Sequence, residues 1–334
     1  MQEATSALSI AISVLFLYNK MTSNIVNVVD RGDVILVVGG DDKILKLRTD
    51  SHMRRAASDA FAALFGPDFA EGKHLSYETA KEIPLPDDDP QALKLICQVI
   101  HLKHSLVPDQ LESNQLLRVA KLVDKYFLHE SMSLAIAKWL HIEDGSHRLN
   151  SLGNYLEAAT LLGQASAFKK ATKALVLNIV EPYDSLINET SSTKLIKTIC
   201  KPATLSYQLM AYLIFSGALE RKRNELQNHL SQAIYDNLSY ATSNNACGCL
   251  TSYMGDLCRM LRNRKLEPAD IRKKPLCNVL ADFGGLPRPK DTTYRGKCSK
   301  WNCDHSLPAT QWQRLRDATT ISNDLFDGLC LQGI

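Results

Sequence analysis

Two β-forming segments separated by a glycine- and aspartate-rich turn constrain the fold of this chain most strongly. Residues 33–38 read DVILVV, a continuous run of mostly β-branched residues. Residues 43–48 read KILKLR, in which apolar and charged side chains alternate, and residues 39–42 (GGDD) separate the two runs. Because glycine and aspartate allow a tight chain reversal, this pattern predicts a β-hairpin.

An amphipathic helix is predicted directly after the hairpin, over residues 51–65. Asp50 or Ser51 can accept hydrogen bonds from its first amides, and Gly66 with Pro67 ends it. Apolar residues recur at three- and four-residue spacing, as expected for one helix face that packs on a core. These residues are Met53, Ala56, Ala57, Ala60, Phe61, Leu64 and Phe65.

A short strand and three further helices are predicted before residue 142. Residues 81–85 give the strand, and Pro84 places it near an edge or an end of the sheet. Residues 87–90 (DDDP) are typical of a helix start, because carboxylates suit the N-terminal amides and proline suits the first turn. We interpret this acidic run as a solvated cap. Two more helices are expected over 113–126 and 131–141.

The remainder of the chain is predicted to be mainly α-helical. Gly145 and Ser146 mark a boundary, and helical patterns follow over 153–162, 165–179, 191–198 and 204–239. After Asn244, glycine, proline, cysteine and basic residues become more frequent. We therefore expect an α+β N-terminal domain, a small sheet with a cluster of helices, followed by a mainly helical C-terminal region with a cysteine-rich tail. The expected parts are residues 1–28, 29–142, 150–243 and 244–334.

The first residues of the chain are unusual. Residues 7–18 (ALSIAISVLFLY) form an apolar run about as long as the core of a signal peptide. However, the residues before this run include Glu3 and no basic residue, whereas a signal peptide begins with basic residues. Asn19-Lys20 after the run is a poor cleavage site. Because a natural start at Met21 fits the sequence that follows, we expect residues 1–28 to be a disordered extension or a non-native start. A signal sequence and a helix packed on the domain remain the alternatives.

Four sequence words in order over about 110 residues resemble a BTB/POZ domain, most closely those of filamentous fungi. They are GDVILVVG (32–39), AASDAFAALFGPDFAEG (56–72), IPLPDDDPQALKLICQVIH (83–101) and LLRVAKLVDKYFL (116–128). The resemblance implies protein–protein binding through self- or hetero-association. It also raises the role of a substrate adaptor for a cullin-3 ubiquitin ligase.

Two positions depart from the pattern of that family. Where the family often has histidine or lysine before the serine that opens the first helix, this chain has Asp50, and Arg54 occupies an apolar position. Because many BTB dimers use this helix, the departures weaken the expectation of the usual homodimer. The candidate interaction residues are Asp33, Asp50, Met53 and Arg54.

The cysteine-rich tail contains the one constellation that could bind a metal. Cys298, Cys303 and His305 bring three zinc-type ligands together within eight residues, and the fungal BTB proteins have a similar tail. The candidate zinc ligands are Cys298, Cys303, His305, Cys330, Cys247 and Cys249. Isolated structural cysteines are the main alternative to a structural zinc site, and redox use is a third. An odd number of cysteines in tight pairs favours a reducing, intracellular compartment over disulfides.

Other classes of function receive little support from the sequence. A formal net charge of +3 does not indicate a surface coated by nucleic acid, and no apolar run reaches the roughly 18 residues of a membrane span. The basic stretch from Arg259 to Lys274 nevertheless leaves a DNA-associated transcriptional regulator as the alternative function. No nucleophile elbow, phosphate loop or dinucleotide fingerprint is present, so we expect no catalytic residues and no enzyme.

Overall fold

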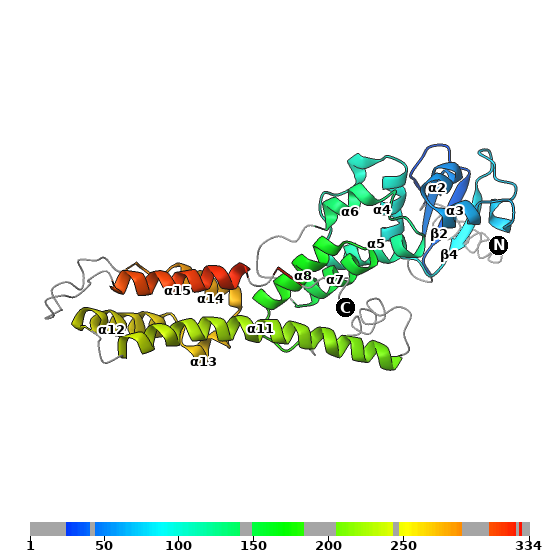
Figure 1. Cartoon of the computed structure of the whole chain (residues 1–334). Coiled ribbons are helices and arrows are strands. Elements are labelled where there is room, and N and C mark those ends of the chain that lie inside the picture. The colour runs from blue at the N-terminus through cyan, green and yellow to red at the C-terminus, as the bar shows by residue number, and fades with distance from the viewer. Residues whose placement is uncertain are drawn as a thin grey trace, which may run out of the picture. The chain divides into compact units, whose positions relative to one another are not determined.

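A computed structural model of the chain shows an α+β protein that divides into two compact units (Figure 1). Unit 1 comprises the described residues up to 140 together with 161–163, and unit 2 comprises the others. The structure describes residues 25–40, 44–140, 149–183, 205–242, 247–288, 307–324 and 327–328. The apolar run over residues 7–18 and the expected helix over 191–198 lie outside these ranges.

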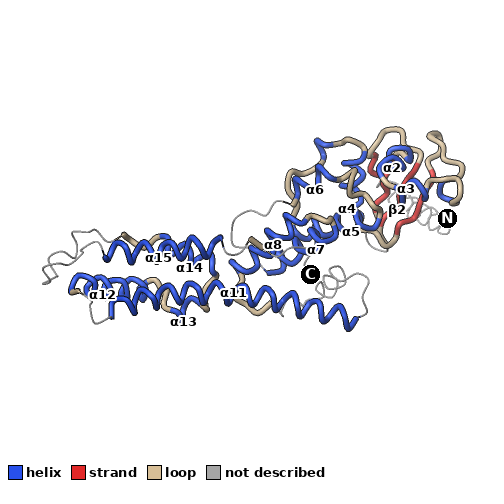
Figure 2. Tube along the Cα trace, in the orientation of Figure 1, coloured by secondary structure: helices blue, strands red, loops and turns tan. Residues whose placement is uncertain are grey.

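Unit 1 contains a β-sheet, drawn in red in Figure 2. It has four strands in the order β1-β3-β2-β4. Strands β2 (Val34–Val38) and β3 (Leu45–Thr49) are antiparallel, which confirms the predicted hairpin. Strand β4 (Lys81–Leu85) is also confirmed; it pairs with β2 in parallel and lies at the edge of the sheet. An edge position tolerates Pro84, because one side of the strand needs no hydrogen-bond donor.

The other edge strand, β1 (Ile25–Asn27), pairs in parallel with β3 and was not expected from the sequence. It lies within the segment 1–28, which we expected to be an extension, so residues 25–27 belong to the folded domain. Three residues are too few for an alternating pattern to be recognised, and only the pairing with β3 identifies them as a strand.

The helices of unit 1 follow the predicted order but differ in one respect. The single helix expected over 51–65 is two helices, α2 (Ser51–Ala57) and α3 (Asp59–Leu64), because Ser58 adopts an extended conformation between them. The Ser58 hydroxyl accepts a hydrogen bond from the Phe61 amide and caps α3. Serine side chains compete with helical backbone in this way. The other helices are η1 (Ala70–Gly72), α4 (Pro90–Ile100), η2 (His104–Leu106), α5 (Ser113–Lys125) and α6 (Ser133–Trp139).

The acidic start of α4 is only partly the solvated cap that we expected. Asp89 caps the helix by accepting from the Ala92 amide at 2.9 Å. Asp88, in contrast, is buried and accepts hydrogen bonds from the Tyr126 hydroxyl and the Lys125 ammonium group. It therefore joins α4 to the end of α5 within the core of unit 1.

All regular secondary structure in the described part of unit 2 is helical. The long helix α11 contacts α8, α12, α13 and α15, so the described residues on both sides of position 244 pack into one unit (Figure 1). No helix in the described part of the chain is both long and apolar enough to cross a membrane. The helices are α7 (Leu149–Leu161), α8 (Ala165–Asn178), α11 (Leu205–Thr242), α12 (Gly248–Asn263), α13 (Pro268–Ile271), α14 (Leu276–Gly284) and α15 (Leu307–Asp324).

Candidate protein-interaction surface

The first candidate interaction residue, Asp33, connects the hairpin to α2. Its side chain is buried, and its two carboxylate oxygens accept from the Ser51 amide at 2.8 Å and the Ser51 hydroxyl at 2.6 Å. Both oxygens are bonded inside the domain, so Asp33 orients α2; these local hydrogen bonds are the role that the sequence favoured for Asp33 over a partner-facing one.

Asp50, at the position where the BTB resemblance leads one to expect histidine or lysine, caps α2. Its carboxylate accepts from the amides of His52 and Met53 at 2.8 and 3.1 Å and from the Tyr77 hydroxyl at 3.1 Å. Its own amide donates to Nε2 of His101 at 3.0 Å. Burial lowers the pKa of His101, which favours the neutral ring that this acceptor role requires. Asp50 therefore stabilises the start of the helix.

Arg54, the fourth candidate interaction residue, lies in the core of unit 1. Its exposed fraction is 0%, and its guanidinium carbon lies 4.1 Å from the centre of the Phe61 ring. One terminal nitrogen, Nη2, lies 3.5 Å from Sγ of Cys97, whereas Nε and Nη1 have no hydrogen-bond partner. Met53, the next residue on α2, is 38% exposed and is the one candidate that projects a large apolar side chain outward.

Two further exposed apolar residues, Leu102 and Phe127, lie just after the ends of α4 and α5, and we did not predict them from the sequence. Leu102 and Phe127 are 68% and 67% exposed, and both have positive φ angles, 59° and 51°. Each follows a helix whose end is closed by a hydrogen bond across six residues, from Lys103 N to Gln98 O and from Leu128 N to Val123 O. Glycine is the usual residue at this position, because the left-handed conformation strains a side chain. The missing glycine is the sequence signal that could have revealed them.

We expect Leu102→Gly and Phe127→Gly to stabilise unit 1 by about 1 kcal/mol each, because glycine adopts positive φ without strain. Neither side chain buries much surface, so little packing is lost. Amide hydrogen exchange across α4 and α5 would measure the change within unit 1.

The control for this prediction is Leu134→Gly on α6. Leu134 is 88% exposed but lies in ordinary helical backbone. Glycine at that position is expected to destabilise the helix, by up to about 1 kcal/mol. Destabilisation by Leu102→Gly as well would show that the leucine side chain makes a stabilising contact.

The predicted zinc ligands are only partly within the described residues. Cys247 and Cys249 are both buried, and Sγ of Cys247 accepts from the Leu250 amide at 3.4 Å, where it caps α12. Cys298, Cys303, His305 and Cys330 lie outside the described ranges. Within those ranges no three histidine, cysteine or acidic side chains could share a metal ion. The zinc site therefore stays a prediction for the undescribed part of the tail.

The purified, untagged protein is expected to contain close to stoichiometric zinc if the tail forms this site. Elemental analysis by mass spectrometry measures it, and double replacement of Cys298 and Cys303 by serine should remove the metal. Less than about 0.2 zinc per chain before any substitution would contradict a structural site, because structural zinc is bound tightly.

The basic stretch of α12 and α13 is largely engaged with acidic and carbonyl groups. Arg259, Arg262 and Lys274 form ion pairs with Asp256, Glu267 and Asp282, respectively. These pairs reduce the positive charge available for phosphates, so the structure adds no support for the DNA-associated alternative.

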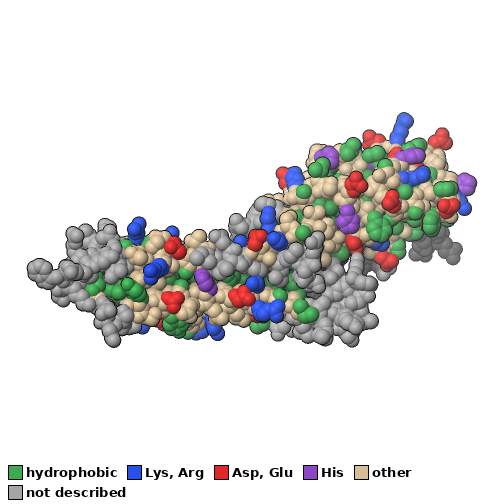
Figure 3. All heavy atoms as spheres, viewed as in Figure 1, with side chains coloured by type: hydrophobic (Ala, Val, Ile, Leu, Met, Phe, Trp, Pro, Cys, Tyr) green, Lys and Arg blue, Asp and Glu red, His purple; other side chains and the backbone are tan. Residues whose placement is uncertain are grey.

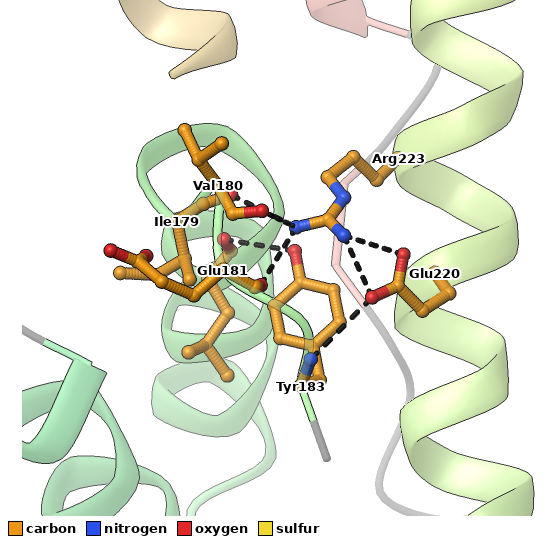
Figure 4. Close-up of polar contacts among 7 residues, drawn as sticks. Ile179, Val180, Glu181, Tyr183, Glu220 and Arg223 are labelled. Atoms are coloured by element: carbon orange, nitrogen blue, oxygen red, sulfur yellow. Dashed lines mark hydrogen bonds and ion pairs between the residues drawn. The ribbon is translucent and has the colours of Figure 1, made fainter. Parts of the chain in front are cut away.

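A cluster of polar contacts joins the end of α8 to α11 in unit 2 (Figure 4). Nη1 of Arg223 donates to the backbone carbonyls of residues 179, 180 and 181 at 3.0–3.2 Å, and Nη2 donates to both carboxylate oxygens of Glu220. The guanidinium carbon lies 4.7 Å from the centre of the buried Tyr183 ring. Because its polar groups already bond one another, this cluster is structural.

Comparison with family models finds no match to the chain, and a search of curated proteins finds no significant similarity.

Proposed function

We propose that residues 29–142 form a BTB/POZ-type domain that binds other proteins or a second copy of this chain. Two observations support the proposal. The four sequence words between residues 32 and 128 resemble this family. The order of elements in unit 1 is compatible with it: a hairpin, two short helices, a strand parallel to the first hairpin strand, and then three helices.

A third observation, the distribution of exposed apolar side chains, carries the proposal. Among the described residues, nine large apolar side chains are exposed in unit 1 and three in unit 2. Burial of such groups against a partner is a main source of association energy. The nine are Ile25, Ile44, Met53, Phe69, Tyr77, Leu102, Leu106, Phe127 and Leu134.

Backbone strain gives two of these residues additional weight. Leu102 and Phe127 retain positive φ where glycine would be more stable, and strained positions of this kind cluster at functional sites. Figure 3 shows apolar side chains among the charged ones on the visible face of unit 1. We assign the partner surface to the side of unit 1 that carries Leu102 and Leu106, because these residues are four apart in one short connection.

Within this class we propose the role of a substrate adaptor for a cullin-3 ubiquitin ligase, with unit 2 as the part that recognises the substrate. This role is what the resemblance to BTB/POZ domains implies. A self-associating regulator would use the same surface of unit 1, so the experiment must separate the two.

Cross-linking affinity purification with quantitative mass spectrometry, paired with light scattering of the purified chain, tests the proposal. The Leu102→Asp/Leu106→Asp double variant is expected to lose the co-purifying cullin-3 or the dimer by tenfold or more, since a buried unpaired charge opposes association. Tyr235→Asp is the matched control, because Tyr235 is an exposed apolar residue of unit 2.

The outcomes separate the roles. Loss of cullin-3 from the double variant supports the adaptor, whereas loss of a dimer with no cullin-3 in either sample supports self-association. A wild-type chain that is monomeric and retains neither cullin-3 nor another copy after cross-linking contradicts the proposed function.

A further inference from the structure

The buried ring of His101 joins the end of α4 to the start of α2 in unit 1. His101 is 6% exposed, and its Nδ1 lies 2.8 Å from the carbonyl oxygen of Cys97, one turn earlier in α4. On the other side of the ring, Nε2 lies 3.0 Å from the amide nitrogen of Asp50, the residue that caps α2. We call these two hydrogen bonds the His101 junction; it connects segments that are 51 residues apart in the chain.

The partners of the ring fix its protonation state. A backbone amide can only donate, so Nε2 must be unprotonated to accept from Asp50. A backbone carbonyl can only accept, so Nδ1 must carry the proton that it donates to Cys97. Only the neutral ring satisfies both partners. A proton added at Nε2 would place two N–H groups against each other and remove the hydrogen bond between α4 and α2.

The surroundings of the ring oppose its positive charge. Burial has the largest effect and holds the pKa of His101 below its ordinary value of 6.5. Among the described residues, two ionisable side chains act on the ring from the start of α2: the Arg54 guanidinium also lowers this pKa, whereas the Asp50 carboxylate raises it. From α4, the Cys97 thiol stays uncharged, because burial raises its own pKa. Two further ionisable residues follow in the connection after α4 and are exposed to water: Lys103 and His104.

We propose that the His101 junction is an acid-sensitive device: protonation of the ring at Nε2 breaks its bond to the Asp50 amide and releases the start of α2 from the end of α4. The stabilisation by the junction is present in full above about pH 6.5, where the ring is neutral in the folded and in the unfolded chain. It is lost as the pH falls from this value through the lower pKa of the folded ring, because the unfolded chain then binds a proton that the folded ring excludes.

Exposed apolar residues lie on both sides of the His101 junction. Leu102 follows His101 directly, and Met53 lies in the first turn of α2, where its amide donates to the Asp50 carboxylate. Release of the junction would therefore free two parts of the proposed interaction domain from each other. We expect partner binding to weaken at acidic pH, a consequence that rests on the proposed function, whereas the release itself needs no partner.

Nuclear magnetic resonance of the full chain tests the release. The ring resonances of His101 report its protonation from about pH 7.5 to about pH 4.5. Hydrogen exchange at each pH gives the protection factor of the Asp50 amide, which is its exchange rate relative to an unstructured peptide at the same pH. This protection factor is expected to fall by about tenfold or more as the ring titrates, since one hydrogen bond is lost. Amides in the middle of α5 should keep theirs.

His101→Gln is the principal variant, because a glutamine oxygen can accept from the Asp50 amide and does not titrate. The protection factor of that amide is expected to stay constant over the same range of pH. His104→Gln is the matched control: it removes an exposed histidine from the same connection and should behave as the wild type does. Arg54→Met should move the titration of His101 to higher pH, because a neighbouring positive charge is gone.

Three results would overturn the proposal: a protection factor of the Asp50 amide that does not change while the ring titrates, a ring that titrates at or above pH 6.5, or a ring that stays neutral throughout. If His101→Gln does not fold, the wild-type titration and the Arg54→Met shift decide the question. Binding is judged separately. Capture of a partner that weakens at acidic pH in the wild type but not in His101→Gln supports the effect on binding, and equal capture contradicts only that effect.

Discussion

Replacement of Arg54 by methionine is expected to stabilise unit 1 by about 2 kcal/mol or more. The guanidinium group is fully buried, and two of its nitrogens have no partner. Removing an ion from water costs several kcal/mol, which only good pairing offsets. Methionine keeps much of the length of the side chain and carries no charge, so it removes the cost without opening a large cavity.

The contacts that Arg54 does make are too weak to offset this cost. The face of Phe61 contributes about 2 kcal/mol to a desolvated cation, less than the several kcal/mol that burial of the charge costs. Cys97 supplies only a sulfur atom as acceptor, and burial raises the pKa of its thiol, which keeps it uncharged. No carboxylate forms an ion pair with Arg54 among the described residues.

Hydrogen exchange across α2 and α4 would measure the effect within unit 1, since global unfolding of a two-unit chain does not define a single free energy. Arg55→Met is the matched control: Arg55 is exposed on the same helix and its replacement should change stability by less than about 0.5 kcal/mol. Slower exchange in the Arg54 variant alone supports the argument. Faster exchange would show that a bound anion or water satisfies the guanidinium group.

The case of Arg54 illustrates where sequence reasoning succeeds and where it stops. The hairpin, strand β4 and the Asp89 cap of α4 depend on residues within a few positions of one another, and the sequence predicts each of them. Burial of Arg54 depends on contacts with Phe61 and Cys97, and the latter lies 43 residues away. The family resemblance marks position 54 as apolar and therefore inward-facing, but no neighbouring residue identifies Cys97 as its contact.

The roles of the candidate interaction residues also depend on contacts that the sequence does not reveal. Asp33 and Asp50 are polar residues at a strand–helix junction, a place where polar residues serve equally for capping and for partner binding. Only their hydrogen bonds to Ser51 and to the α2 amides distinguish the two uses. Strand β1 could not be predicted, because three residues are too few to show an alternating pattern and their pairing partners in β3 lie twenty-one residues further along the chain. Leu102, in contrast, was within reach, since a leucine where a helix-ending glycine is expected is visible in the sequence.

The second large effect is expected in unit 2, where Arg223→Ala should destabilise the junction of α8 and α11 by about 3 kcal/mol. The substitution removes the donor of three backbone carbonyls and leaves the Glu220 carboxylate with only the long bond from the Tyr183 amide, at 3.4 Å. Hydrogen bonds to a charged group contribute about 1.5–3 kcal/mol. The carbonyls lie just beyond the C-terminus of α8, where a positive charge also favours the helix dipole.

Lys222→Ala is the matched control, because Lys222 is the adjacent residue and its ion pair with Glu225 is exposed on both sides. Such surface pairs contribute about 0–1 kcal/mol, so the control should change little. Hydrogen exchange over the last turn of α8 and the middle of α11 would measure both variants.

Arg223→Lys separates the effect of charge from that of geometry. An ammonium group cannot bond the carboxylate through two parallel donors while it also reaches three carbonyls, so only part of the stability should return. Full recovery with lysine would show that the positive charge alone holds the junction, and an unchanged Arg223→Ala variant would show that packing does.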